Sequence, residues 1–179
     1  MESTAAASTG TSATPVAIGL RYGLLIGLVS IIASFAFLSL GMQDSWWKSL
    51  LSVIILVGGL VLAQQQFKKQ NAGFMSYGEG LGVALVAGCV AGLLNALFLY
   101  AYATIIAPEF QQMILDKARE GMEARGNLDD EKIDQAMSIT SRFMMPLMIG
   151  SVLLVSVVQA LVIGLISSAF VKNTKPEFE

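Results

Sequence analysis

The chain alternates between four long apolar runs and short polar stretches. These runs predict membrane-spanning helices at residues 18–42, 47–64, 80–107 and 147–171. A helix needs roughly 20 apolar residues to cross the hydrocarbon core of a bilayer, and the second run is near the lower limit of that length. We therefore predict an all-α integral membrane protein, built as a bundle of four transmembrane helices.

The segment between the third and fourth runs, residues 108–146, is different in kind because it carries many charges. Apolar positions recur at helical spacing in two blocks, on either side of a break at Gly126-Asn127. Asp129 and Asp130 suit the first turn of the second block, since acids are favourable at the positive end of a helix. This pattern predicts an extramembrane amphipathic helical hairpin, which either lies on the lipid or folds over the bundle.

The two ends of the chain read as tails around a membrane domain at residues 16–171. Residues 1–15 are mostly Ser, Thr and Ala, so they cannot bury apolar surface and are expected to be disordered. They lack the positive start of a secretory signal, which argues against cleavage. Residues 172–179 form a short charged tail.

Composition strengthens the membrane assignment and limits the chemistry. Only 13% of the 179 residues are charged, whereas soluble domains have about a quarter, so membrane lipid is the expected solvent. The net charge of −2 leaves no basic face for nucleic acid. Histidine is absent, which removes the commonest general base and metal ligand. Cys89 is alone in an apolar run and is expected to be a buried, unreactive thiol.

No set of residues reads as a catalytic, cofactor-binding or metal site. The acids of residues 108–146 do not have the spacing of a calcium loop, and a solvated helix face explains them better. The glycine-rich stretch at residues 78–82 has no accompanying lysine or strand and is interpreted as close packing at a helix start. We predict that the protein is not an enzyme.

Charged residues beside the runs indicate an orientation. With four spans, one membrane face carries most of the flanking bases, namely Arg21, Lys68, Lys69, Lys172 and Lys175. Short loops rich in Lys and Arg remain in the cytoplasm, so both termini are predicted to be cytoplasmic in an inner membrane, with the hairpin outside. The bases of the hairpin itself count against this orientation.

Small residues recur every fourth position in three of the four runs, a spacing that lets helix backbones approach closely in lipid. The positions with the strongest prediction of helix packing are Gly19, Gly23, Gly27, Gly88, Gly92, Ala160 and Gly164. Packing within one chain is the favoured interpretation, and a homo-oligomer interface is the alternative. Neither interpretation implies chemistry.

Four polar side chains are candidates for contacts between helices. Asn95 and Gln159 fall in the middle of the third and fourth runs, where they either join helices through amide hydrogen bonds or line a polar path. Arg21 and Glu79 fall near the same membrane face, at the starts of the first and third runs. They either form an ion pair between two helices or are solvated separately at the interface.

Several motifs resemble a known family. They are Phe74-Met75-Ser76-Tyr77-Gly78-Glu79, Ala107-Pro108-Glu109-Phe110, the stretch at residues 128–137, and Arg142-Phe143-Met144-Met145-Pro146. In this order they resemble the bacterial membrane proteins catalogued as domain of unknown function 4199, over roughly residues 16–171. The resemblance implies a compact inner-membrane protein with four spans, and it implies no activity.

Two functional hypotheses from different classes remain. The first is an accessory or scaffold subunit that acts through contacts, with a protein partner at residues 108–146, because an amphipathic hairpin needs a cover for its apolar face. The alternative is a small transporter or flippase for a lipid-linked or amphipathic substrate, suggested by the polar pair Asn95 and Gln159. Co-purified partners or lipid movement in vesicles would discriminate between them.

Overall fold

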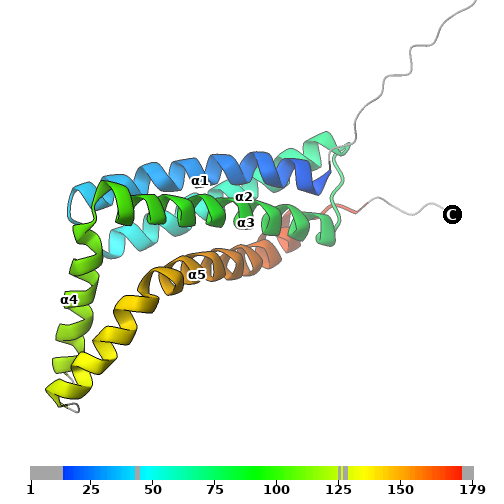
Figure 1. Ribbon diagram of the computed structural model, residues 1–179. Helices are drawn as coiled ribbons and strands as arrows, with labels where there is room; N and C mark the ends of the chain where they lie inside the picture. The colour runs from blue at the N-terminus through cyan, green and yellow to red at the C-terminus, as the bar shows by residue number, and fades with distance from the viewer. Residues whose placement is uncertain (1–13, 43–44, 125, 127–128, 175–179) are drawn as a thin grey trace, which may run out of the picture.

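The computed structural model describes residues 14–42, 45–124, 126 and 129–174. Its elements are α1 (Pro15–Ser39), α2 (Trp46–Gln70), α3 (Tyr77–Ala101), the π-helix η1 (Tyr102–Ile106), α4 (Glu109–Glu123) and α5 (Asp130–Val171), as Figure 1 shows. Four helices are long and apolar enough to cross a membrane: α1, α2, α3 with η1, and α5. The prediction of an all-helical protein with four long apolar helices is confirmed. Most of the tail predicted at residues 1–15 lies outside the described residues.

Helix α3 lies at the centre of the arrangement. It packs along both α1 and α5, which do not pack against each other, while α2 contacts α1, α3 and α5 less extensively. In lipid there is no hydrophobic force between helices, so close backbone approach has to provide the attraction. The two long contacts of α3 are therefore where small residues are needed.

The glycines of α1 lie against one face of α3. A Cβ atom added at Gly23 would lie 2.7 Å from the backbone oxygen of Ala87, and one at Gly27 would lie 2.6 Å from Cδ1 of Leu94. Gly19 is equally close to the side chain of Val86. A side chain at any of these positions would force its neighbour on α3 to shift, so the stripe of α1 is an interface within the chain.

The opposite face of α3 packs against α5 in the same way. A Cβ at Gly92 would lie 2.7 Å from Cβ of Ser156, and one at Gly164 would lie 2.7 Å from Cβ of Ala84. Gly88 faces Ala160, which is fully buried. The small residues singled out in the sequence thus form two interfaces that hold α3 between its neighbours.

Helix α2 reaches further than predicted, because polar residues expected to end the second span are part of the fold. Gln64 is fully buried, and its Nε2 donates to the carbonyl oxygen of Gly80 at 3.1 Å and to Oγ of Ser168 at 3.0 Å. One turn on, Nζ of Lys68 donates to the carbonyl oxygen of Val171 at 3.1 Å, at the C-terminus of α5. These bonds close the bundle at one end.

At the other end, α3 leads into α4 through a sharp turn. The chain passes through the π-helix η1, and Gln111 of α4 returns to donate from Nε2 to the carbonyl oxygen of Ala103 at 2.9 Å. The ring of Phe110 meets Tyr102 edge-on, with 5.5 Å between centroids. The hydrogen bond and the ring contact together fix the direction in which α4 leaves the bundle.

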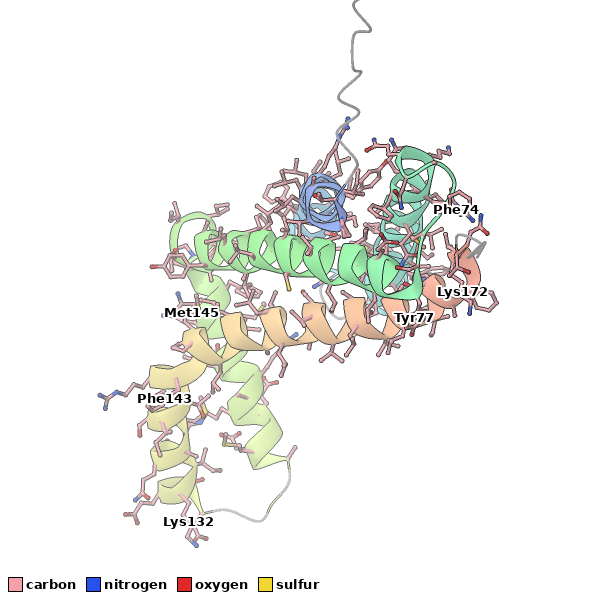
Figure 2. The ribbon with its side chains drawn as sticks, turned by 90° about the vertical axis from the view of Figure 1, so that its right-hand side faces the viewer. Phe74, Tyr77, Lys132, Phe143, Met145 and Lys172 are labelled. Atoms are coloured by element: carbon pink, nitrogen blue, oxygen red, sulfur yellow. The ribbon has the colours of Figure 1, made fainter. Side chains whose placement is uncertain are left out.

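Helix α5 is continuous from the hairpin into the bundle, whereas the sequence suggested two elements that meet near residue 146. Pro146 lies inside the helix and cannot donate the usual backbone hydrogen bond to the carbonyl four residues earlier. Figure 2 shows α5 changing direction beside Phe143 and Met145. Proline therefore marks a bend in one long helix and not a break between two.

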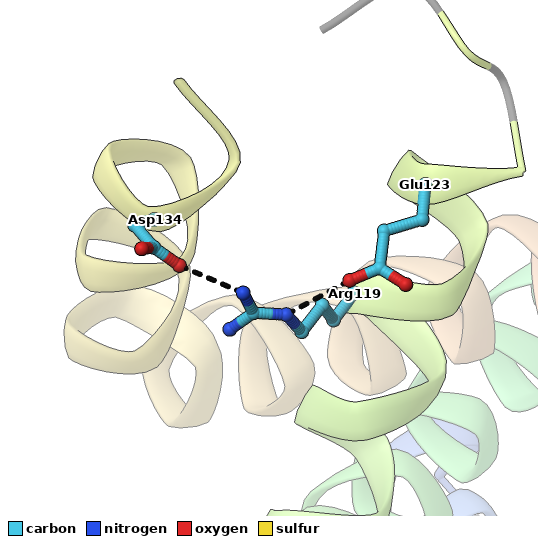
Figure 3. A network of polar contacts seen from close by, with 3 residues as sticks. All are labelled: Arg119, Glu123 and Asp134. Carbon is cyan, nitrogen blue, oxygen red and sulfur yellow. Dashed lines mark hydrogen bonds and ion pairs between the residues drawn. The ribbon is translucent and has the colours of Figure 1, made fainter. Parts of the chain in front are cut away.

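Helix α4 and the first part of α5 form an arm that projects away from the bundle in both views (Figures 1 and 2). Of the two placements predicted for the hairpin, folding over the bundle is therefore wrong. Arg119 ties the two helices together, with 2.9 Å from Nε to Oε1 of Glu123 and 2.9 Å from Nη2 to Oδ1 of Asp134 (Figure 3). The hydrogen bond to Glu123 and the charge of Asp134 raise the pKa of Arg119, so the guanidinium stays charged.

Candidate ligand cavity between the helices

A cavity of about 310 Å³ lies between the four long helices. It is bounded by all of them and by Phe110 of α4, so it sits toward the end of the bundle from which the arm departs. The opposite end is closed by the bonds of Gln64 to α3 and α5. The space exists because α5 diverges from its neighbours as it approaches the bend at Pro146 (Figure 1).

Polar side chains from every bounding helix line this cavity. Their positions follow helical spacing, because residues four apart lie on one face of a helix. They are Ser30 and Ser34 of α1, Lys48 and Ser52 of α2, Asn95 of α3, and Ser156 and Gln159 of α5. The remaining lining residues are mainly aliphatic or aromatic, so the cavity is amphipathic.

Among the described residues, Lys48 is the only ionisable one that lines the cavity. It lies in the first turn of α2, where there is no acidic residue and where Ser45, the N-cap, makes no side-chain hydrogen bond to the helix. Among the described residues the Lys48 ammonium has no hydrogen-bond or ion-pair partner. Because a helix N-terminus carries a partial positive charge, the described groups of the cavity wall at Lys48 contribute positive charge.

The predicted pair Asn95 and Gln159 lines the same cavity, but the two residues do not bond to each other. Nδ2 of Asn95 donates to the carbonyl oxygen of Ala91 in its own helix at 2.8 Å. Gln159 is exposed and makes no hydrogen bond to another described residue. Of the two contacts expected for these amides, a bond to each other is absent and a bond to a backbone carbonyl is present at Asn95, and the feature that both share is the cavity.

Of the two alternatives for Arg21 and Glu79, the structure shows no ion pair between them. Oε2 of Glu79 accepts hydrogen bonds from the backbone N of Ser76 at 2.7 Å and from its Oγ at 2.8 Å. The backbone N of Glu79 donates to that Oγ at 3.3 Å, which completes a capping box at the start of α3. Arg21 is exposed on α1. Ser-x-x-Glu before an apolar run is the signature of a capping box, so the sequence contained this signal.

Sequence reasoning missed the serines and the lysine of the cavity, and it missed Gln64. The spacing Ser30–Ser34 and Lys48–Ser52 was a usable signal, since each pair puts two polar groups on one face of an otherwise apolar helix. Cys89, expected to be buried, is exposed on α3.

These features define an all-helical protein with four helices of membrane-spanning length, a projecting helical arm and an amphipathic cavity. Residues 21–173 match the family described as protein of unknown function DUF4199, and the chain belongs to that family. The resemblance inferred from the motifs is thereby confirmed. No curated protein and no solved structure matches the chain.

Proposed function

We propose that this chain is a multi-pass protein of the bacterial inner membrane that acts through contacts and not through catalysis. The outward surface of its long helices supports insertion, because large apolar side chains on each are open to the surroundings. Examples are Ile32 of α1 at 69%, Ile54 of α2 at 57%, Leu97 of α3 at 59% and Leu154 of α5 at 66% exposure. A continuous apolar surface of this kind is unfavourable in water and favourable in lipid.

The charges at the two ends of the bundle support an orientation with both termini in the cytoplasm. Lys68, Lys69 and Lys172 lie at the end where α2 and α5 finish and where α1 and α3 begin. Lys48 lies at the other end, with the arm. Basic residues in short loops remain on the cytoplasmic side, so the arm is proposed to lie outside.

The arm supplies the observation that supports a contact function. It departs sideways from the bundle, so it runs along the membrane surface if the long helices cross the bilayer. Its α5 portion exposes a stripe of apolar residues, Ile139 at 62% and Phe143 at 51%, one turn apart. We propose that this stripe is where a protein partner binds.

Site-specific photocrosslinking in living cells tests this proposal. A photoreactive residue at Phe143 should crosslink to a discrete second protein, and the same residue at Ser141 should not. Ser141 is a matched control because it is also exposed but is two residues away, on the other side of the helix. Crosslinks from Phe143 to lipid alone would contradict the contact function.

The cavity favours a second candidate function, the movement of an amphipathic molecule between membrane leaflets. Asn95 and Gln159 present polar groups to a space within the membrane-spanning part of the bundle. Polar side chains at that depth are energetically unfavourable and commonly mark a pathway for a substrate. Fluorescent phospholipid in reconstituted vesicles should then change leaflet, and the double variant Asn95→Leu with Gln159→Leu should stop it. Equal rates with and without protein would exclude this function.

A further inference from the structure

We propose that the cavity binds the phosphate-bearing headgroup of an anionic lipid, with Lys48 as the charged contact and with the acyl chains left in the bilayer. This inference rests on the proposed insertion into a membrane and names a ligand class for the cavity. The volume of about 310 Å³ is at the lower end of ligand sites, enough for a headgroup and too small for a whole lipid.

The sign of the charge comes from Lys48. An ammonium group that lines a cavity without an acidic partner attracts an anion, and no carboxylate of the described residues lines this cavity. A ligand amine would meet like charge there, with no described carboxylate to balance it. The uncapped N-terminus of α2 adds partial positive charge at the same place.

The hydroxyl groups near Lys48 are also available. Serines inside helices commonly donate to a carbonyl one turn back, and several in this chain do, such as Ser151 to Met148 at 2.8 Å and Ser156 to Val152 at 2.7 Å. The three serines on the Lys48 side behave differently: no hydrogen bond to another described residue is made by the side chains of Ser30, Ser34 and Ser52. Three free hydroxyls and one ammonium form a donor set suited to phosphate oxygens.

The depth of Lys48 favours a lipid over a free phosphate ion. Trp46 and Trp47 directly precede it, are exposed, and stack with 3.9 Å between ring centroids. Tryptophans gather at the level of the lipid headgroups, so Lys48 lies where lipid phosphates lie. Apolar lining residues such as Leu56 and Val155 continue from the donor set toward the hydrocarbon.

The lipid headgroup enters the cavity from the bilayer between α2 and α5. These helices are joined through Gln64 and Ser168 at the far end, and residues of both line the cavity toward the arm. Gln159 and Val155 of α5 line the cavity and are also exposed, so the cavity reaches the outer surface of the bundle along α5. A lipid can therefore place its headgroup inside while its chains stay outside.

Native mass spectrometry of the full chain in detergent tests the inference. With dioleoylphosphatidylglycerol added, the wild type should retain one lipid, and with dioleoylphosphatidylcholine it should not. Lys48→Gln should weaken retention by about tenfold or more, since a charge-assisted hydrogen bond is lost. Lys48→Arg should keep most of it. Lys69→Gln is the matched control, because it removes the same charge from the opposite end of α2.

Three results would overturn the inference: equal retention of both lipids, an unchanged Lys48→Gln variant, or competition by inorganic phosphate as strong as that by the lipid. The last would make the cavity a phosphate site. The double variant Ser34→Ala with Ser52→Ala keeps the charge and should weaken retention on its own, which guards against a folding defect at Lys48. Thermal melting of each variant reports the fold independently.

The failure of this inference can be distinguished from the failure of the proposed functions. Lipid retention without lipid movement between leaflets would reject only the transport function. A chain that stays soluble without detergent would reject membrane insertion.

Discussion

Gln64 and Ser168 join α2 to α5 through a hydrogen bond of 3.0 Å between two fully buried side chains. The same Nε2 atom also bonds to Gly80, so one amide group joins three helices. Its Oε1 atom is buried and has no protein partner. The joint closes the bundle at the end away from the cavity.

Removal of this joint should destabilise the fold in a coupled way. We expect Gln64→Leu to cost about 1–2 kcal/mol, since two hydrogen bonds disappear, and Ser168→Ala to cost about 0.5–1 kcal/mol. Because Ser168 contributes through Gln64, the double variant should cost no more than Gln64→Leu alone. Thermal unfolding in detergent measures all three. Additive losses would show that the two residues act separately.

The glycines of α1 should respond to a single methyl group according to their surroundings. Gly23→Ala puts a Cβ atom 2.7 Å from a backbone oxygen of α3 and should cost about 1–3 kcal/mol through overpacking. Gly58→Ala on α2 meets nothing within 4 Å and should be neutral or slightly stabilising. Detergent melting curves of the two variants provide the comparison. A similar loss at both positions would contradict the account, because Gly58 has no close neighbour and alanine favours a helix more than glycine does.

The capping box at the start of α3 should be independent of Arg21. Glu79→Ala removes the acceptor for Ser76 and should cost about 1 kcal/mol, the usual value of a helix cap. Arg21→Ala should change stability by less than about 0.5 kcal/mol, as is typical for an exposed residue without a partner. The losses should add in the double variant. A double variant more stable than Glu79→Ala would reveal an ion pair that the structure does not contain.

Replacement of Arg119 should destabilise the arm locally and leave the bundle unaffected. Arg119→Gln removes the contacts to Glu123 and Asp134, so amide hydrogen exchange should rise in α4 and in the first part of α5. Exchange in α1 and α3 should stay unchanged, because all three side chains are exposed on the arm. Faster exchange throughout the chain would show that the arm supports the whole fold.

The pH dependence of this cluster has a defined sign. The pKa of Arg119 is raised in the fold, so its contribution is complete below the ordinary arginine pKa and is lost only as the pH rises past the folded value. Titration of Arg119 should therefore leave exchange in the arm constant from neutral to mildly alkaline pH, measured with correction for the intrinsic exchange rate. Loosening of the arm over that range would contradict the assignment.

The sequence predicts the long helices well because each is a long apolar run, and length alone identifies such a run. It also identifies the glycine stripes, since spacing by four residues reveals a helix face. Prediction from the sequence fails where a residue type is compatible with two structural roles. Because Gln64 is polar, the sequence predicted that the second span ends there. In the structure its side-chain amide is inside the bundle and is hydrogen-bonded to α3 and α5. Pro146 was predicted to separate the hairpin from the fourth span, whereas in the structure it lies at a bend in one continuous helix.

The cavity was predictable only in part. Asn95 and Gln159 stand out as amides in apolar runs, so sequence analysis found them. Ser30, Ser34 and Ser52 are small and common in such helices, and nothing in one helix shows that they face residues of another. The role of Lys48 could not be predicted, because its place beside the cavity depends on how α1, α2 and α5 pack. Contacts between distant segments decide these roles.

Labelling of single cysteines in intact cells tests the central claim, that four spans place the arm on the outer side and the termini in the cytoplasm. Ala124 ends α4 and Ala72 lies between α2 and α3. Both are exposed, and both already carry a Cβ atom, Ala72 at a positive φ of 52°, so cysteine adds only a sulfur atom there, unlike at Gly126 and Gly73. The variants also carry Cys89→Ala, because Cys89 is the only native cysteine and is exposed.

An impermeant maleimide should label Ala124→Cys in intact cells and should label Ala72→Cys only after the membrane is opened. That result would establish that the arm and the α2–α3 loop lie on opposite sides, as four spans require. Labelling of Ala72→Cys alone in intact cells would invert the protein, and labelling of both positions would contradict the four-span account.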